Sequence, residues 1–308
     1  MRLPKLINAV TSVDGQELLP AGSEITPAIL DKLIRSYPQP LPAPQSMLEH
    51  GDIAGDLETF LQSEPYSRIF ADEETTTIVK TLMGEVRLPP AVLQSLDYFK
   101  ANDPYTYRHI MLVFAISTRL ILDFVSDSQD LISEATTGPT HDFGKICMPL
   151  SILTKSSPLT ETERSILQQH TLAGYVLLAY YFQDSNHLAA RVALDHHEKR
   201  DGSGYPRGIA LEDRIVEIVA VSDVYDALIS PRPYRGASYD NRTALEEITC
   251  LAQDGKFDVE VVRALIACNR SSRPSPADCY VSDEQRGTPP SESCYGQTAP
   301  EEQETVSD

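Results

Sequence analysis

Histidine and aspartate residues recur along the chain in an order that suits metal chemistry. The candidate ligands are His109, His141, Asp142, His170, His196, His197 and Asp223. Imidazole nitrogens and carboxylate oxygens are the donors that first-row ions such as iron, manganese and zinc accept in proteins. Seven ligands are too many for one ion, but they suit two ions about 3.5–4 Å apart, an arrangement that clamps a phosphoester and produces hydroxide at neutral pH. The pattern therefore predicts a binuclear centre.

The spacing of the histidines supports the same interpretation. His196 and His197 are adjacent, so on one helix their side chains point about 100° apart and serve two neighbouring ions more readily than one. Each residue also has an ordinary alternative, because a lone inward histidine such as His170 is more often a hydrogen-bonded core residue than a ligand. His50 and His187 lie outside the pattern and are expected at the surface. It is the ordered set that favours a metal centre.

Composition excludes several classes of function. The chain has 308 residues, with 26 Lys and Arg against 45 Asp and Glu, for a net charge of −19. This charge disfavours binding to a nucleic acid polymer, but a small anion can still be held by a few local cations or metals. No apolar run is long enough to span a bilayer, and the first residues lack the apolar core of a signal peptide. Five cysteines without a C-x-x-C pair predict reduced thiols and a cytoplasmic location.

The elements that must position these ligands are mainly helical. Residues 91–268 carry apolar residues at three- and four-residue spacing and predict an all-α bundle. A small N-terminal domain, 1–90, is expected before it, with a β-hairpin around Asp14, a helix over 26–36 capped by Thr26, a proline-rich linker over 37–44 and short helices to about residue 90. The acidic, Pro- and Ser-rich residues 269–308 predict a disordered tail.

Local signals refine how three ligands are presented. Thr160 and Glu163 form a capping box that starts a helix, whose apolar face runs on through His170 and turns that side chain inward. Gly and Pro in residues 136–140 would break a helix, so His141 is expected on a loop or on a helix that starts late. Gly202 and Gly204 predict a turn with positive φ values beside His196 and His197.

Three stretches of the sequence carry a family resemblance. They are HDFGKICMPLSILTKSSPLTETERSILQQHTLAGYVLL, ALDHHEKRDGSGYPRG and IVAVSDVYDALISPRPYR. In this order they closely resemble the HD-GYP family of the HD phosphohydrolase superfamily, whose members are cyclic di-GMP phosphodiesterases. The resemblance runs from Tyr105 to about Phe257. It implies an HD-type helical bundle and a metal-dependent enzyme that hydrolyses cyclic di-GMP to pGpG, to GMP or to both.

The resemblance also assigns roles to individual residues. It makes the seven residues above the metal ligands, with Asp142 bridging two divalent ions, iron or manganese, and a bridging hydroxide attacking phosphorus. Lys145 matches the family lysine that contacts the reacting phosphate, so Asp142 and Lys145 are the catalytic candidates. Arg232 and Arg235 match phosphate-contacting positions. Tyr205, in the GYP loop, is expected beside the substrate.

Other implications concern metal number, partners and rival functions. Tyr105 stands where three-metal members carry a glutamate, which favours two metals. The family implies contacts between the GYP loop and diguanylate cyclase (GGDEF) domains, and a homodimer is left open. One alternative is a non-catalytic cyclic di-GMP receptor or interaction module, favoured only by the polar residues before His141. Another is an HD hydrolase acting on a different cyclic dinucleotide.

Overall fold

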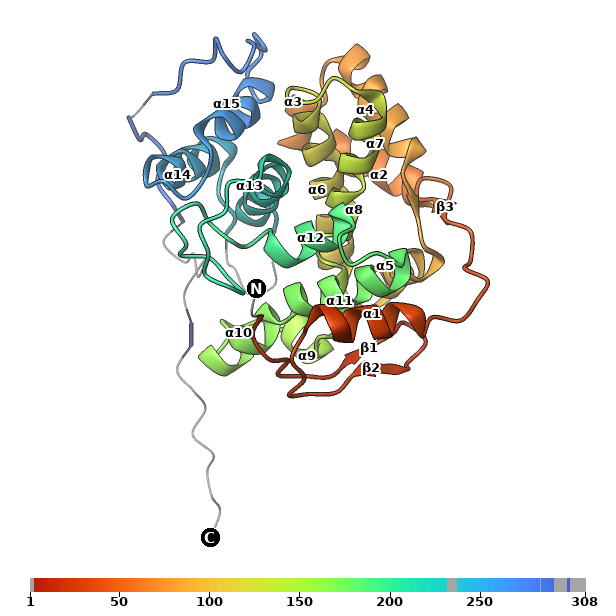
Figure 1. The fold of residues 1–308 in the computed structure, drawn as a ribbon. Helices are drawn as coiled ribbons and strands as arrows, with labels where there is room; N and C mark the ends of the chain where they lie inside the picture. Colours follow the sequence, from red (N-terminus) through yellow and green to blue (C-terminus); the bar gives the residue numbers. More distant parts are fainter. Residues whose placement is uncertain (1–2, 232–236, 283, 291–297, 300–308) are drawn as a thin grey trace.

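The computed structural model describes residues 3–231, 237–282, 284–290 and 298–299 (Figure 1). In this part of the chain, helices predominate, and the strands form only two small antiparallel sheets. The predicted fold class, mainly α, is confirmed. No helix in the described residues is long and apolar enough to cross a membrane.

The N-terminal unit forms a hairpin and a helix, as predicted. Strand β1 (Val10–Thr11) pairs with β2 (Glu17–Leu19), and α1 (Pro27–Arg35) follows, with the Thr26 side chain accepting a hydrogen bond from the backbone N–H of Ile29. This unit lies beside α11 (His170–Phe182) (Figure 1), and the Tyr181 hydroxyl accepts a 2.9 Å hydrogen bond from the Val13 N–H.

The segment between α1 and residue 90 contains three helices of modest length, also as predicted. They are α2 (Ile53–Gln62), α3 (Tyr66–Ile69) and α4 (Glu73–Glu85). A second small sheet, which the sequence did not predict, joins β3 (Gln45–Ser46) to β4 (Arg87–Leu88). Two residues per strand are too few for the alternation of polar and apolar residues that reveals a strand.

The remaining helices include a central pair, around which the others pack. They are α5 (Pro90–Asn102), α6 (Pro104–Ile121), α7 (Ser128–Ala135), α8 (Thr137–Thr140), the 3₁₀ helix η1 (Phe143–Cys147), α9 (Leu150–Leu153), α10 (Glu161–Gln168), α11, α12 (Leu188–Asp195), α13 (Arg214–Ile229), α14 (Asn241–Gln253) and α15 (Val259–Cys268). The pair is α6 and α13, which pack against each other. Both are buried over most of their length, and helices that are apolar on nearly all sides belong in a core.

One continuous apolar core joins the N-terminal unit to the helical bundle. Its buried side chains run from Leu3 to Cys279. The division into residues 1–90, 91–268 and 269–308 therefore concerns segments that share a core, and it stays a prediction. Disorder of the tail also stays a prediction, although described tail residues make contacts: the Gly287 N–H donates to Glu246 and the Ala299 N–H to the Leu159 carbonyl.

Candidate metal centre

The fold brings all seven predicted ligands to one place. His109 comes from α6, His141 from the end of α8, Asp142 from the start of η1, His170 from the start of α11, His196 and His197 from the end of α12, and Asp223 from α13. His50 and His187 lie elsewhere, as expected. The surface position expected for them is met only in part, because both are half-buried, with His50 bonded to Asp97 and His187 stacked on Phe182.

The segment before His141 forms a short helix, α8, which is separated from α7 by one residue and contains Gly138 and Pro139. A helix was one of the two arrangements that the sequence allowed, but the expectation that this glycine and proline break a helix is wrong. α8 is wholly buried. A Cβ on Gly138 would lie 2.5 Å from the Ser117 hydroxyl oxygen and 2.9 Å from the Phe114 Cα, so only glycine lets α8 approach α6 this closely. The Thr137 hydroxyl donates to the Glu134 carbonyl at 2.6 Å. The polar segment is therefore packed and hydrogen-bonded, and it holds His141 in place.

Three imidazoles are oriented by backbone carbonyls. Their Nδ1 atoms donate to carbonyl oxygens three or four residues earlier: His141 to Gly138 at 2.7 Å, His170 to Leu167 at 2.6 Å, and His196 to Val192 and Ala193 at 3.1 and 3.0 Å. A carbonyl can only accept, so in the neutral ring Nδ1 carries the hydrogen and Nε2 keeps a lone pair. Each helical turn thus presents its Nε2 as a ready metal donor.

Two of these rings are held neutral. Burial lowers the pKa of His170 to about 4 and, together with the neighbouring histidines, lowers the pKa of His196 to about 3. Their Nε2 atoms lie only 3.4 Å apart. At neutral pH, neither nitrogen carries a hydrogen to share, so two lone pairs face each other. A cation between or beside them would turn this repulsion into coordination.

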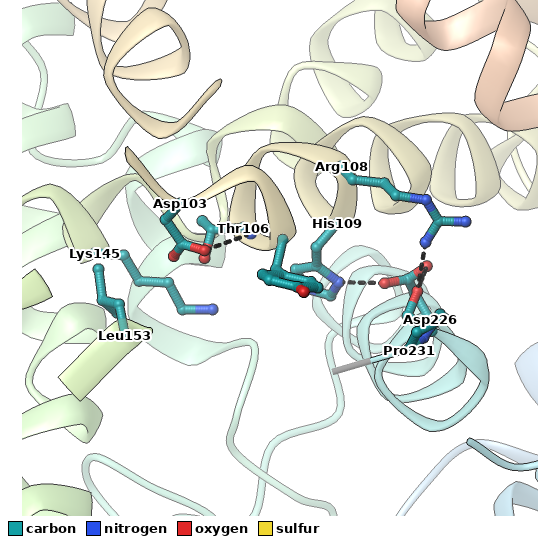
Figure 2. A pocket seen from close by; sticks show the side chains of 10 residues that line it. Asp103, Thr106, Arg108, His109, Lys145, Leu153, Asp226 and Pro231 are labelled. Atoms are coloured by element: carbon teal, nitrogen blue, oxygen red, sulfur yellow. Dashed lines mark hydrogen bonds and ion pairs between the residues drawn. The ribbon is translucent and has the colours of Figure 1, made fainter. Parts of the chain in front are cut away.

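His109 has a different environment. Its Nδ1 lies 2.6 Å from Asp226 Oδ2, and its Nε2 lies 3.1 Å from Asp223 Oδ1. Burial opposes charge on this ring, but the two carboxylates outweigh it and raise the pKa of His109 to about 9. Asp226 also accepts a 2.5 Å hydrogen bond from the Tyr66 hydroxyl. In the view of Figure 2, Asp226 and Lys145 lie on opposite sides of His109.

Asp142 lies between the two sides of the cluster. Its Oδ2 is 3.6 Å from His109 Nε2, and its Oδ1 is 3.4 Å from His170 Nε2. Burial alone would raise the pKa of Asp142, but Lys145, whose ammonium lies 2.5 Å away, and His141 hold it well below the ordinary range. Asp142 is therefore an ionised carboxylate facing both sets of imidazoles.

The donor set fits metal ions. His141 Nε2 and Asp142 Oδ1 are buried and make no hydrogen bond within the described part of the chain, a costly state that coordination would relieve. Three groups of side chains have donor atoms within 4.8 Å of one another: His170, His196 and His197; His109, His141 and Asp223; and His141, Asp142 and His196.

The DGSGYP loop covers one side of the centre. Gly202 has φ of 76°, as predicted, but Gly204 does not adopt a positive φ, and that part of the prediction is wrong. Glycine is required there for another reason: a Cβ would lie 2.3 Å from the His197 carbonyl oxygen. The next residue, Tyr205, stacks on the His197 ring with centroids 4.5 Å apart and planes 26° from parallel.

Two cavities adjoin the centre. The smaller, about 230 Å³, is lined by Arg108, His109 and Asp226 among others (Figure 2). The larger, about 490 Å³, contains Lys145, His197, Tyr205 and Asp223 in its wall. The predicted substrate residues Lys145 and Tyr205 thus border the same cavity as two candidate ligands. Arg232 and Arg235 lie outside the described residues.

Sequence reasoning missed several residues of the site. Asp226 orients His109, and a signal was available, because Asp226 follows Asp223 by three residues and must share its helix face. Lys199 and Lys256 line the larger cavity. No signal could have found Lys256, because it is brought to the cavity by the packing of α14 and α15.

The comparisons with known proteins identify a family for this chain. The HD domain family profile matches residues 95–261. The chain is 35% identical over 192 residues to a cyclic di-GMP phosphodiesterase of Pseudomonas aeruginosa, covering 61% of this chain and 45% of the relative. It is 37% identical over 179 residues to a cyclic di-GMP phosphodiesterase of Thermotoga maritima, covering 57% and 47%.

A third relative has a different named substrate. The chain is 32% identical over 197 residues to a 3′3′-cGAMP-specific phosphodiesterase of Vibrio cholerae, covering 62% of this chain and 44% of the relative. The chain spans about half the length of these three relatives. It belongs to the HD domain family. Its ordered set of candidate ligands and its DGSGYP loop resemble the HD-GYP group of that family.

Proposed function

We propose that the chain is a metal-dependent phosphodiesterase that hydrolyses cyclic di-GMP to linear pGpG, to GMP or to both. The observation that carries the proposal is the convergence of imidazole lone pairs and the ionised Asp142 beside a cavity that also holds Lys145. The names of the two most similar relatives reported above support the substrate.

The arrangement of donors supports two divalent ions, iron or manganese. The group of His109, His141 and Asp223 shares no member with the group of His170, His196 and His197. Asp142 lies between these groups and is the proposed bridging ligand. Two bound ions would polarise the phosphate and, by lowering the pKa of a bridging water, supply hydroxide as the nucleophile.

The chain's own residues would orient the substrate and offset its charge. The Lys145 ammonium, beside Asp142, is placed to offset charge on a phosphoryl oxygen as it develops, which is how fixed cations act in phosphoryl transfer. Tyr205, stacked on His197, forms part of the cavity wall where a nucleotide would lie. Contacts of Arg232 and Arg235 with phosphate remain predictions, as do GGDEF partners, a homodimer and a cytoplasmic location.

The test is turnover by metal-reconstituted protein. Protein purified without oxygen is loaded with Fe(II) or Mn(II), incubated with cyclic di-GMP, and its products are separated by chromatography. We expect pGpG or GMP, and no product after chelation. Tight binding of cyclic di-GMP without product under every metal would instead identify a receptor. The polar segment that favoured this alternative is packed and hydrogen-bonded.

A second candidate substrate is 3′3′-cGAMP. It is favoured by the relative of that named specificity in Vibrio cholerae. Parallel assays with both cyclic dinucleotides at equal concentration would decide between them. A kcat/KM for 3′3′-cGAMP well above that for cyclic di-GMP would replace the proposed substrate and retain the proposed reaction.

A further inference from the structure

The larger cavity contains two lysines that form no ion pair with the described residues. Lys199 lies just beyond α12, and Lys256 lies in the turn between α14 and α15. Within the described residues, neither ammonium has an acidic oxygen at ion-pair distance, whereas Lys145 in the same cavity is paired with Asp142. In a chain with 45 acidic residues, two unpaired cations in one cavity are unusual.

Both lysines are half-buried, and the Lys199 side chain is held by an aromatic ring. The Lys199 ammonium lies 4.1 Å from the centroid of the Phe257 ring, a cation–π contact that restrains a flexible side chain. Two like charges on one wall, partly withdrawn from water, repel each other, and the carboxylates that attract Lys199 do so without a direct ion pair in the described structure. An anionic ligand bound between them would remove this cost.

The cavity contains the other features that a nucleotide needs. Its lining joins the candidate metal centre, through His197 and Asp223, to the two lysines, with Leu251 and Val224 supplying apolar surface. Its volume of about 490 Å³ falls in the range of about 300–1,000 Å³ that is typical of small-molecule sites. A ligand that reacts at the metals and reaches the lysines must carry a second anionic group.

We propose that Lys199 and Lys256 bind the second, non-reacting phosphate of a cyclic dinucleotide. This inference rests on the proposed function, in which the first phosphate lies at the metals beside Lys145. The two lysines would then act as positioning residues that distinguish dinucleotides from simple phosphodiesters. A linear dinucleotide with a 5′ phosphate still carries two phosphates, so the same subsite would retain it for a second cleavage.

The test compares two substrates in four variants. Lys199→Gln and Lys256→Gln remove each charge, and Lys32→Gln removes an exposed lysine of α1 as a control. The substrates are cyclic di-GMP and bis(p-nitrophenyl) phosphate, a diester with one phosphate. We expect each cavity variant to raise KM for cyclic di-GMP about tenfold, the usual value of one charged hydrogen bond. The ratio of kcat/KM for cyclic di-GMP to that for the simple diester should fall by the same factor, and Lys199→Arg should restore most of it.

Two results would overturn the proposal. An unchanged ratio with both activities lowered would mean that the substitutions act through the metal ligands, and an unchanged KM would mean that the lysines do not touch the substrate. Failure of the proposed function would look different, because wild-type protein would then leave cyclic di-GMP intact. In that case, calorimetric titration with cyclic di-GMP and with pGpG still decides, since about tenfold weaker binding in both cavity variants is required.

Discussion

His170 and His196 are held by carbonyls of their own helical turns, whereas His109 is held by a carboxylate from another helix. The first two donate Nδ1–H to residues three or four positions earlier, and burial lowers their pKa values to about 4 and 3. His109 faces Asp226 and Asp223, which outweigh burial and raise its pKa to about 9. The same side chain is neutral on one side of the centre and charged on the other.

The contrast shows two ways of preparing a histidine to bind a metal. A carbonyl of the same turn fixes the ring and its tautomer without adding charge, so this side depends on local helix geometry. A carboxylate from α13 fixes the ring and also makes it a stronger donor once it has lost its proton. That second side depends on the packing of α6 against α13, and Tyr66 extends it to α3.

The largest expected effect follows from removing the residue that serves both sides. Asp142→Asn should lower turnover on the order of 10³-fold or more, because it removes a buried carboxylate that lies between the two sets of imidazoles and is the proposed bridging ligand. Metal content by mass spectrometry and cyclic di-GMP turnover are the measurements, with Asp31→Asn, at an exposed residue of α1, as the control. Full activity in metal-loaded Asp142→Asn would refute the bridging role.

The second prediction weakens only the carboxylate-held side. Asp226→Asn should lower metal affinity by about 10–100-fold, the usual effect of losing the partner that orients a ligating histidine. Tyr66→Phe, which removes only the hydroxyl bonded to Asp226, should cause a smaller loss. Titration against a chelator measures both. Wild-type affinity in Asp226→Asn would show that the carboxylate does not support His109.

The third prediction disturbs a carbonyl-held histidine through packing. Gly138→Ala should destabilise the protein by about 1–3 kcal/mol, because the new methyl group would overlap Ser117 and Phe114. Gly84→Ala in α4 is the matched control: nothing lies within 4 Å of its new Cβ, so it should stabilise by up to about 1 kcal/mol. Denaturant unfolding compares the two, and equal effects would mean that α8 does not depend on a close approach to α6.

The smallest expected effect concerns a carboxyl group outside the centre. Burial, with Asp130 and Asp213 adding repulsion, raises the pKa of Glu134 from 4.5 to about 7, and its Oε2 makes no hydrogen bond in the described structure. Because the pKa of Glu134 is higher in the folded protein than in the unfolded chain, the contribution of this group to stability is complete below about pH 4.5. That contribution is lost as the pH rises through 7.

The Glu134→Gln substitution tests this directly. The variant should gain stability relative to wild type between pH 5 and pH 8, because glutamine cannot ionise. Urea unfolding at both pH values is the measurement. A difference between variant and wild type that stays constant with pH would show that Glu134 keeps its ordinary pKa. Asp142 is also buried, but it has Lys145 as a charged partner. A constant difference would mean that Glu134, without such a partner in the described structure, behaves as a solvated carboxyl group.

Much of the fold and the site could be predicted from local signals. The Thr160–Glu163 capping box is present, but the glycine and proline before His141 lie inside α8 and do not break it. The helix that was expected to run from Thr160 through His170 is interrupted at Gln169, which lies between the end of α10 and the start of α11. The Gln169 side chain accepts a hydrogen bond from the Ile7 N–H, a contact 162 residues away that no local pattern could reveal.

The sequence by itself determined the types and order of the seven candidate ligands, the helical bundle and the family, because these depend on residue chemistry and short periodic patterns. Only the tertiary structure decided how each histidine is held and charged. A pKa depends on burial and on charges brought from distant segments, as Asp226 is brought to His109 and Lys256 to the cavity. These distances are fixed by helix packing, which local sequence patterns do not specify.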